Sequence, residues 1–141
     1  MTFASLITRQ PRAFDPDRGR EALEVLPSLP PEIAGLLEGT AGSSPYLAGL
    51  IEKEAAWLEG ALDAGPEAAR DALLDAARAA EDRDLPVALR QLKGRMALLT
   101  ALAVLGGVWP LEEVTGALSV TADLAVDRAL MAAVAVEIRR G

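Results

Sequence analysis

The chain has 141 residues, of which 51% are apolar and 4% are aromatic, and it carries a formal net charge of −7. This length suits a single domain with a sizeable core. Cysteine and histidine are absent from the sequence, which excludes disulfides, thiolate chemistry, imidazole catalysis and most zinc sites. Because the acidic balance repels nucleic acid and anionic membranes, we expect neither as a partner.

The apolar residues favour helices over strands. Alanine, leucine and valine make up most of them, and no convincing run of alternating β-branched residues is present. Since such residues lose little side-chain freedom in a helix, we predict an all-α, compact bundle of about six to seven helices with no significant sheet. The most apolar run, residues 96–109, is shorter than the ~20 residues of a membrane span. The start of the chain is too short and too polar for a secretory signal, so we expect a cytoplasmic protein.

The first 16 residues contain two prolines and no sustained helical period. We expect residues 1–16 to form an extended lead-in, followed by a single helical domain over residues 17–141 that is the N-terminal part of a longer chain. Either Asp15 or Asp17 suits a helix N-terminus. The first helix is therefore predicted to begin at one of them and to end before Pro27.

The second predicted helix starts at Pro30-Pro31, because proline is favoured at the first helical position. It covers residues 32–38, and Gly39 is its expected C-cap. The sequence GTAGSS at residues 39–44 predicts a loop. This stretch lacks the lysine and the preceding strand of a phosphate-binding loop, so a plain connection between helices is favoured.

Two further helix starts follow the same chemistry. Ser44 can cap a helix over residues 46–62, with a candidate break near Glu54. Gly65-Pro66 then starts a helix over residues 67–82, whose small apolar residues recur at helical spacing.

The longest apolar helix is predicted over residues 85–105, with Asp84 as its cap. Its second half is almost entirely apolar, and a helix that is apolar on all sides must be surrounded by protein. Gly106-Gly107 ends this helix, and the chain restarts after Trp109-Pro110. The last two predicted helices cover residues 111–118 and about 122–139.

Two Asp-x-Asp pairs, Asp15/Asp17 and Asp82/Asp84, have the spacing with which nucleotidyltransferases hold Mg²⁺. Such a pair normally lies on a strand behind a Gly-Ser turn. Neither pair has that setting here, and both lie where helix caps are expected. Capping is therefore the favoured interpretation, and a complete small enzyme that uses these carboxylates stays as an alternative hypothesis.

Arg90, Lys93 and Arg95 form a basic entrance to the long apolar helix, whereas residues 21–82 carry three cations against thirteen acids. On a helix Arg90 and Lys93 lie about 60° apart, and Arg95 points well away from them. The first two therefore form a joint patch. This patch could bind a phosphate or an acidic partner surface, or it could be a solvated face that balances the acidic body.

Two blocks of the sequence carry a family likeness. The first is GTAGSSPYLAGLIEKEAAWL, residues 39–58, and the second, residues 89–127, contains R-x-x-K-x-R, an L-x-G stretch, LEEVTGALS and an Ala-Asp pair. In this order they resemble the N-terminal region of the glutamine synthetase adenylyltransferase/deadenylylase family. The aspartate that precedes L-x-G in that family is replaced here by Val104.

The resemblance implies a bifunctional enzyme that adds AMP to a tyrosine of glutamine synthetase and removes it again. Such an enzyme uses two nucleotidyltransferase domains, Mg²⁺ and ATP, under the control of glutamine and the PII signalling protein. Its Mg²⁺-binding Asp-x-Asp motif is expected downstream of the present region. The chain itself is then expected to hold no cofactor, to be inactive alone, and to have glutamine synthetase, PII and the downstream domain as partners.

The resemblance also supplies candidate residues that face the active-site cleft or a partner: Ser44, Tyr46, Arg90, Lys93 and Arg95. A different class of function stays open beside it. The chain could be a stand-alone helical interaction module that buries Trp109 or Tyr46 against a partner or in a homodimer.

Overall fold

The computed structural model describes residues 2–26 and 28–140, and over these residues the chain forms eight α-helices and one 3₁₀ turn, with no strand. The predicted all-α class without a sheet is confirmed, and the helices outnumber the prediction. The elements are α1 (Phe3–Leu6), α2 (Pro16–Leu23), α3 (Pro31–Ser43), α4 (Pro45–Lys53), α5 (Ala55–Ala64), α6 (Pro66–Ala79), η1 (Asp82–Asp84), α7 (Leu85–Leu105) and α8 (Leu111–Arg140).

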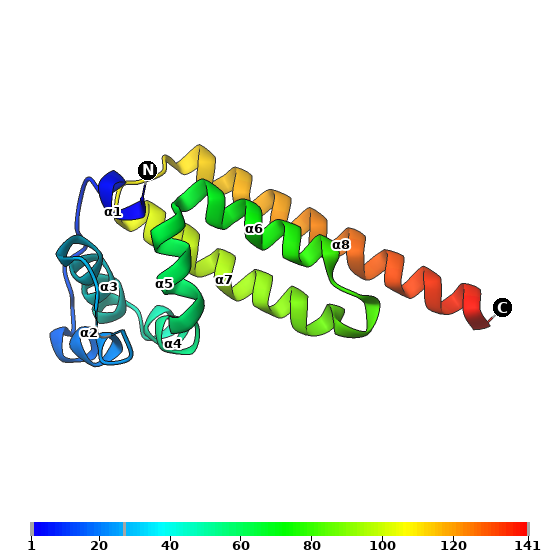
Figure 1. Cartoon of the computed structure of the whole chain (residues 1–141), viewed down its shortest axis with the longest axis horizontal. Coiled ribbons are helices and arrows are strands. Elements are labelled where there is room, and N and C mark those ends of the chain that lie inside the picture. The colour runs from blue at the N-terminus through cyan, green and yellow to red at the C-terminus, as the bar shows by residue number, and fades with distance from the viewer. Residues whose placement is uncertain (1, 27, 141) are drawn as a thin grey trace.

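Three long helices, α6, α7 and α8, lie side by side and form the body of the molecule (Figure 1). The shorter helices α1–α5 gather at one end of this body, near the start of α6 and the end of α7. The N-terminus lies at that end. At the other end, the C-terminal part of α8 runs beyond its neighbours.

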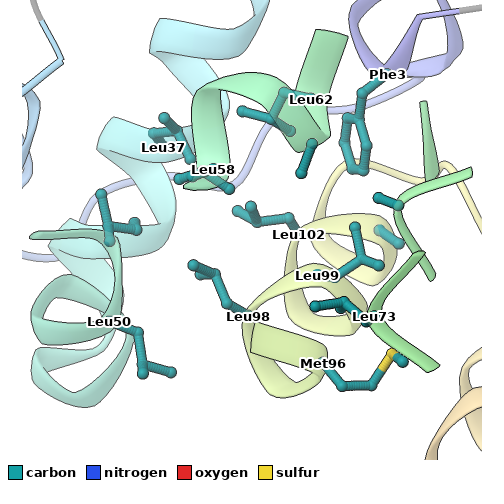
Figure 2. Packing of buried hydrophobic residues seen from close by; sticks show 14 of the residues in the cluster. Phe3, Leu37, Leu50, Leu58, Leu62, Leu73, Met96, Leu98, Leu99 and Leu102 are labelled. Carbon is teal, nitrogen blue, oxygen red and sulfur yellow. The ribbon is translucent and has the colours of Figure 1, made fainter. Parts of the chain in front are cut away.

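The central helix is α7, as its apolar sequence predicts. Leu98, Leu99 and Leu102 are completely buried, and Figure 2 shows them in one cluster with Leu58 on α5 and Leu73 on α6. Burial of a leucine side chain contributes about 1.5–3 kcal/mol each. The core therefore joins helices from both ends of the chain around α7.

The predicted loop at residues 39–44 is wrong, because α3 continues as a helix as far as Ser43. Gly39 is not a C-cap but an interior helical residue. Glycine in a helix interior costs about 1 kcal/mol relative to alanine, so local preference alone argues for the loop. The helix is instead stabilised by tertiary contacts with the N-terminal segment.

That segment, between α1 and α2, runs along the face of α3 that carries Gly39 and Gly42. A Cβ atom at Gly39 would lie 2.1 Å from the carbonyl oxygen of Pro11, and one at Gly42 would lie 2.5 Å from the Cβ of Ala13. The amide of Asp15 donates to the carbonyl of Gly42 at 2.8 Å. The glycines are therefore needed for the close approach of two backbones.

The N-terminal segment also closes the end of α7. The amides of Thr8 and Arg9 donate to the carbonyl of Gly106 at 2.8 and 3.2 Å, which satisfies a terminal helix carbonyl. Gly107 has a φ of 66°, a conformation that favours glycine at a helix end, and the predicted stop is confirmed. The expected extended lead-in differs from the structure near its start, where α1 forms one helical turn that buries Phe3.

The two final helices of the prediction are one continuous helix, α8. The sequence after Leu118 has β-branched and hydroxyl side chains that lower helix propensity, but neither proline nor glycine occurs in residues 117–140. The hydroxyl of Thr121 donates to the carbonyl of Ala117 at 2.8 Å, so this polar group is satisfied within the helix. The low helix propensity of these residues, without a proline or glycine, therefore did not end the helix.

Two of the predicted N-terminal caps are confirmed. Asp15 accepts from the amide of Arg18 at 3.2 Å and begins α2, and Ser44 caps α4 in the same way. The next break falls at Glu54, between α4 and α5, as expected. The predicted N-cap at Asp84 is wrong, as is the C-cap at Gly39: in the described chain the Asp84 side chain makes no capping hydrogen bond to α7, because the turn η1 leads directly into that helix.

The close contact at Gly39 generates a stability prediction. Gly39→Ala places a methyl group against Pro11, and we expect the free energy of unfolding to fall by about 1–3 kcal/mol, as for other overpacked sites. Gly49→Ala on α4 is the matched control. A Cβ there has no described heavy atom within 4 Å, so we expect a gain of about 0.5–1 kcal/mol from helix propensity. Urea unfolding measures both, and equal stabilities would contradict the contact.

Candidate functional site

The predicted basic cluster divides into two parts in the structure. Arg90 and Lys93 lie exposed on the first half of α7, as a joint patch requires. Arg95 is turned away from them and is partly buried. Two cations are therefore free of the core and available to solvent or a partner, whereas the third has a place inside the fold.

Arg95 contacts the residues at the break between α4 and α5. Its Nε donates to Oε2 of Glu54 at 2.7 Å, and its guanidinium carbon lies 5.4 Å from the centre of the Trp57 ring. The Glu54 side chain is 8% exposed, against 26% for Arg95. A buried carboxylate needs such a charged partner, so Arg95 acts first as a structural residue.

The predicted residues on α4 also have different roles. The Ser44 hydroxyl oxygen accepts from the amide of Leu47 at 3.2 Å, which is a capping contact. Tyr46 is 63% exposed at the start of the same helix. Of this pair, Tyr46 is the residue that is accessible to a partner.

The carboxylates of the two Asp-x-Asp pairs have partners of other kinds. Asp15 caps α2, and Asp17 pairs with Arg20 on the same helix. Asp82 lies 3.5 Å from Nη1 of Arg128 on α8. Among the described residues, no group of three potential metal-ligating side chains comes together.

A second polar cluster fixes the corner between α7 and α8. The indole nitrogen of Trp109 donates to Oε1 of Glu67 at 3.0 Å. The guanidinium carbon of Arg70 lies 5.6 Å from the centre of the same ring, and its Nη1 lies 3.5 Å from Glu113. Cation–π contact and ion pairing thus tie the start of α8 to α6.

Sequence reasoning did not find the partners in these two clusters. Glu54 and Arg95 are 41 residues apart, and Glu67 and Trp109 are 42 apart. No periodicity links positions at such distances. The sequence offered one general signal for these partners, because a tryptophan indole or an arginine needs a hydrogen-bond partner once it is buried.

One cavity in the described part of the chain lies apart from the predicted site residues. It has a volume of about 470 Å³ and opens between α1, α5 and the segment before α3. Ile33 and Leu62 supply apolar lining, and Glu59 and Asp63 line it as well. It brings together none of the five residues that the sequence singled out.

The comparison with known proteins decides the family. The sequence model of glutamate–ammonia ligase adenylyltransferase matches residues 35–141. The chain belongs to this family. The matched range covers most of α3 and all of the elements from α4 to α8, so the family includes the body of the fold described above.

Curated relatives agree with this assignment. The bifunctional glutamine synthetase adenylyltransferase/adenylyl-removing enzyme of Caulobacter vibrioides is 39% identical over 139 residues, which cover 91% of this chain and 14% of that relative. The enzymes of the same name from Rhodopseudomonas palustris and Bradyrhizobium sp. are 41% and 35% identical, over 72% and 93% of this chain.

The chain spans about one seventh of the length of the adenylyltransferases that it matches, since it covers 14% and 15% of two of them. No solved structure matches it. Over residues 2–26 and 28–140, none of the helices has the length and apolar character needed to cross a bilayer.

Val104 has a backbone role in this chain. Its carbonyl oxygen accepts from Nη2 of Arg9 at 2.6 Å. The N-terminal segment is thus attached to the end of α7 at Val104 as well as at Gly106 and Gly107. This contact does not depend on the side chain at residue 104.

The buried Glu54–Arg95 pair generates a prediction. Arg95→Met leaves the Glu54 carboxylate buried without its partner, and we expect a loss of about 2–3 kcal/mol in the free energy of unfolding. Arg90→Met, on the exposed side of α7, is the matched control and should change stability by less than about 0.5 kcal/mol.

A double-mutant cycle with Glu54→Gln separates the pair from packing effects. The double variant should be more stable than the sum of the single losses predicts, by about 1 kcal/mol or more. Strict additivity in urea unfolding would show that the two side chains do not stabilise each other.

Proposed function

We propose that this chain is the N-terminal helical part of an enzyme that attaches AMP to glutamine synthetase and removes it, and that its role is structural and partner-binding. The observation that carries the proposal is the family match, which covers residues 35–141 but only 14% of the Caulobacter vibrioides relative. In this proposal the nucleotidyl-transfer chemistry, with its Mg²⁺ and ATP, belongs to the rest of the enzyme.

The partners of the aspartates support a non-catalytic role. Two carboxylates that hold Mg²⁺ must be free to point at one ion, but Asp15 is engaged in a helix cap and Asp82 lies beside Arg128. Asp17 and Asp84 also lie near arginines, Arg20 and Arg83. Each of these carboxylates thus has a local structural contact that accounts for it.

The exposed residues support a partner-binding role. Arg90 and Lys93 on α7 and Tyr46 on α4 are accessible. The two cations contrast with the net charge of −7 of the chain. Arginine and tyrosine are common at the centres of protein interfaces. We propose that they face glutamine synthetase or the downstream nucleotidyltransferase domain in the cytoplasm, with PII acting on the complete enzyme.

A chimeric enzyme tests the proposal. The stretch of the Caulobacter vibrioides enzyme that this chain matches, 14% of its length and 39% identical, is replaced by this chain. We expect the chimera to add AMP to glutamine synthetase and to remove it, and the isolated chain to do neither. Addition or removal of AMP by the isolated chain, or a folded chimera without either activity, would contradict the proposal.

Charge reversal tests the basic patch. We expect Arg90→Glu with Lys93→Glu to lower AMP removal by the chimera by about tenfold or more, because two repulsive charges replace two attractive ones at a partner surface. The double variant Arg20→Glu with Arg78→Glu changes two exposed cations elsewhere and serves as the control. Equal rates for all three chimeras would make the patch a solvated face.

A further inference from the structure

Helix α5 borders a cavity that the proposed function does not use. α1 packs against α5, and the cavity of about 470 Å³ lies between these helices and the segment that leads into α3. Its apolar lining includes Ile33 and Leu62, which are 2% and 5% exposed, and the half-buried Leu29. Cavities of about 300–1,000 Å³ with apolar walls hold small-molecule ligands. The size and the apolar lining therefore suit a small organic molecule.

The charge of this cavity is negative. Glu59 and Asp63 line it from α5, and both are exposed. Since residues four apart lie on one side of a helix, the two carboxylates share the side of α5 that borders the cavity. Neither lysine nor arginine is among the described residues that line it. The two negative charges are therefore not balanced within the described lining.

On this side α5 also carries residues that weaken a helix. Like charges four residues apart are destabilising, and Gly60, which lines the cavity as well, has a lower helix propensity than alanine. A Cβ atom at Gly60 would have no described heavy atom within 4 Å, and its φ is not positive. Neither a close contact nor the backbone requires glycine there, in contrast to Gly39 and Gly107. Such departures from local preference are typical of functional sites.

The lining decides which class of ligand fits. Ca²⁺ and Mg²⁺ are held by about six oxygen ligands, but among the described residues no group of three potential metal-ligating side chains comes together. The side chain of a single lysine from a protein partner would fill only part of the volume. A ligand with a carboxylate of its own would place it beside Glu59 and Asp63, and like charges repel. An apolar body with one ammonium or guanidinium group satisfies both the apolar lining and the charge.

We propose that the cavity between α1, α5 and the segment before α3 binds a small organic cation. The ammonium or guanidinium group of this ligand lies at Glu59 and Asp63. Its apolar body contacts the buried side chains of Ile33 and Leu62, and Gly60 leaves the space that it fills. The site is made by this chain alone, so it does not depend on the proposed function.

Titration of the whole chain with 2-phenylethylammonium tests the site. NMR spectra of the ¹⁵N-labelled chain follow the amides of Ser28 and Gly60, and we expect saturable shifts with a Kd of about 1 mM or lower. 2-Phenylethanol has the same apolar body without the charge, and L-phenylalanine adds a carboxylate to the ammonium compound. Both should bind about fivefold more weakly or less well still. Equal affinities for the three compounds, or shifts that do not saturate, would overturn the proposal.

Two variants locate the binding in the cavity. Gly60→Leu fills the space and should abolish saturable binding, whereas Gly49→Leu at an exposed position of α4 is the matched control and should leave the Kd unchanged. Glu59→Gln with Asp63→Asn should weaken the binding of 2-phenylethylammonium by about fivefold or more and leave that of 2-phenylethanol unchanged. Unchanged affinity for the cation in either variant would place it elsewhere and overturn the proposal.

Urea unfolding without ligand separates binding from packing. Gly60→Ala and the carboxylate double variant each remove a feature that weakens α5, so we expect neither to lower the free energy of unfolding. A loss of stability in either would show that these residues serve the fold, and would overturn the proposal. If Gly60→Leu does not fold, the carboxylate double variant decides the NMR test by itself.

Discussion

The contact between the N-terminal segment and the glycine face of α3 is the constraint on which much of this structure depends. Gly39 and Gly42 allow the segment to lie against the helix at distances that no Cβ atom would permit. The segment then reaches the end of α7, where it supplies donors to the carbonyls of Val104 and Gly106. A single stretch of chain without secondary structure thereby connects α3 to the central helix.

Arg18 stabilises the same region through two hydrogen bonds. Its Nε and Nη2 donate to the carbonyls of Ala41 and Gly42, each at 2.9 Å. These are terminal carbonyls of α3 that lack partners within the helix. The side chain therefore extends the cap that the N-terminal segment provides, and the last turn of α3 stays helical although its sequence favours a loop.

Hydrogen bonds of charged side chains fix the other helices relative to one another. The Glu54–Arg95 contact ties the α4–α5 break to α7, the Trp109–Glu67 contact ties the α7–α8 corner to α6, and Arg128 ties α8 to the end of α6. These contacts also show which cations of α7 belong to the surface. Arg95 belongs to the interior framework, and the cations that remain accessible on α7 are Arg90 and Lys93.

The sequence by itself determined the all-α class and several helix boundaries, because proline, capping residues and apolar periodicity act within a few residues. These boundaries are the starts of α2, α4 and α6, the break at Glu54, and both ends of α7. Tertiary structure decided the length of α3, the continuity of α8 and the role of Arg95, since each depends on residues distant in the chain. The sequence of residues 39–58 and 89–127 also indicated the family. Which side chains face outward was decided by packing, because burial is a property of the assembled helices and not of any single one.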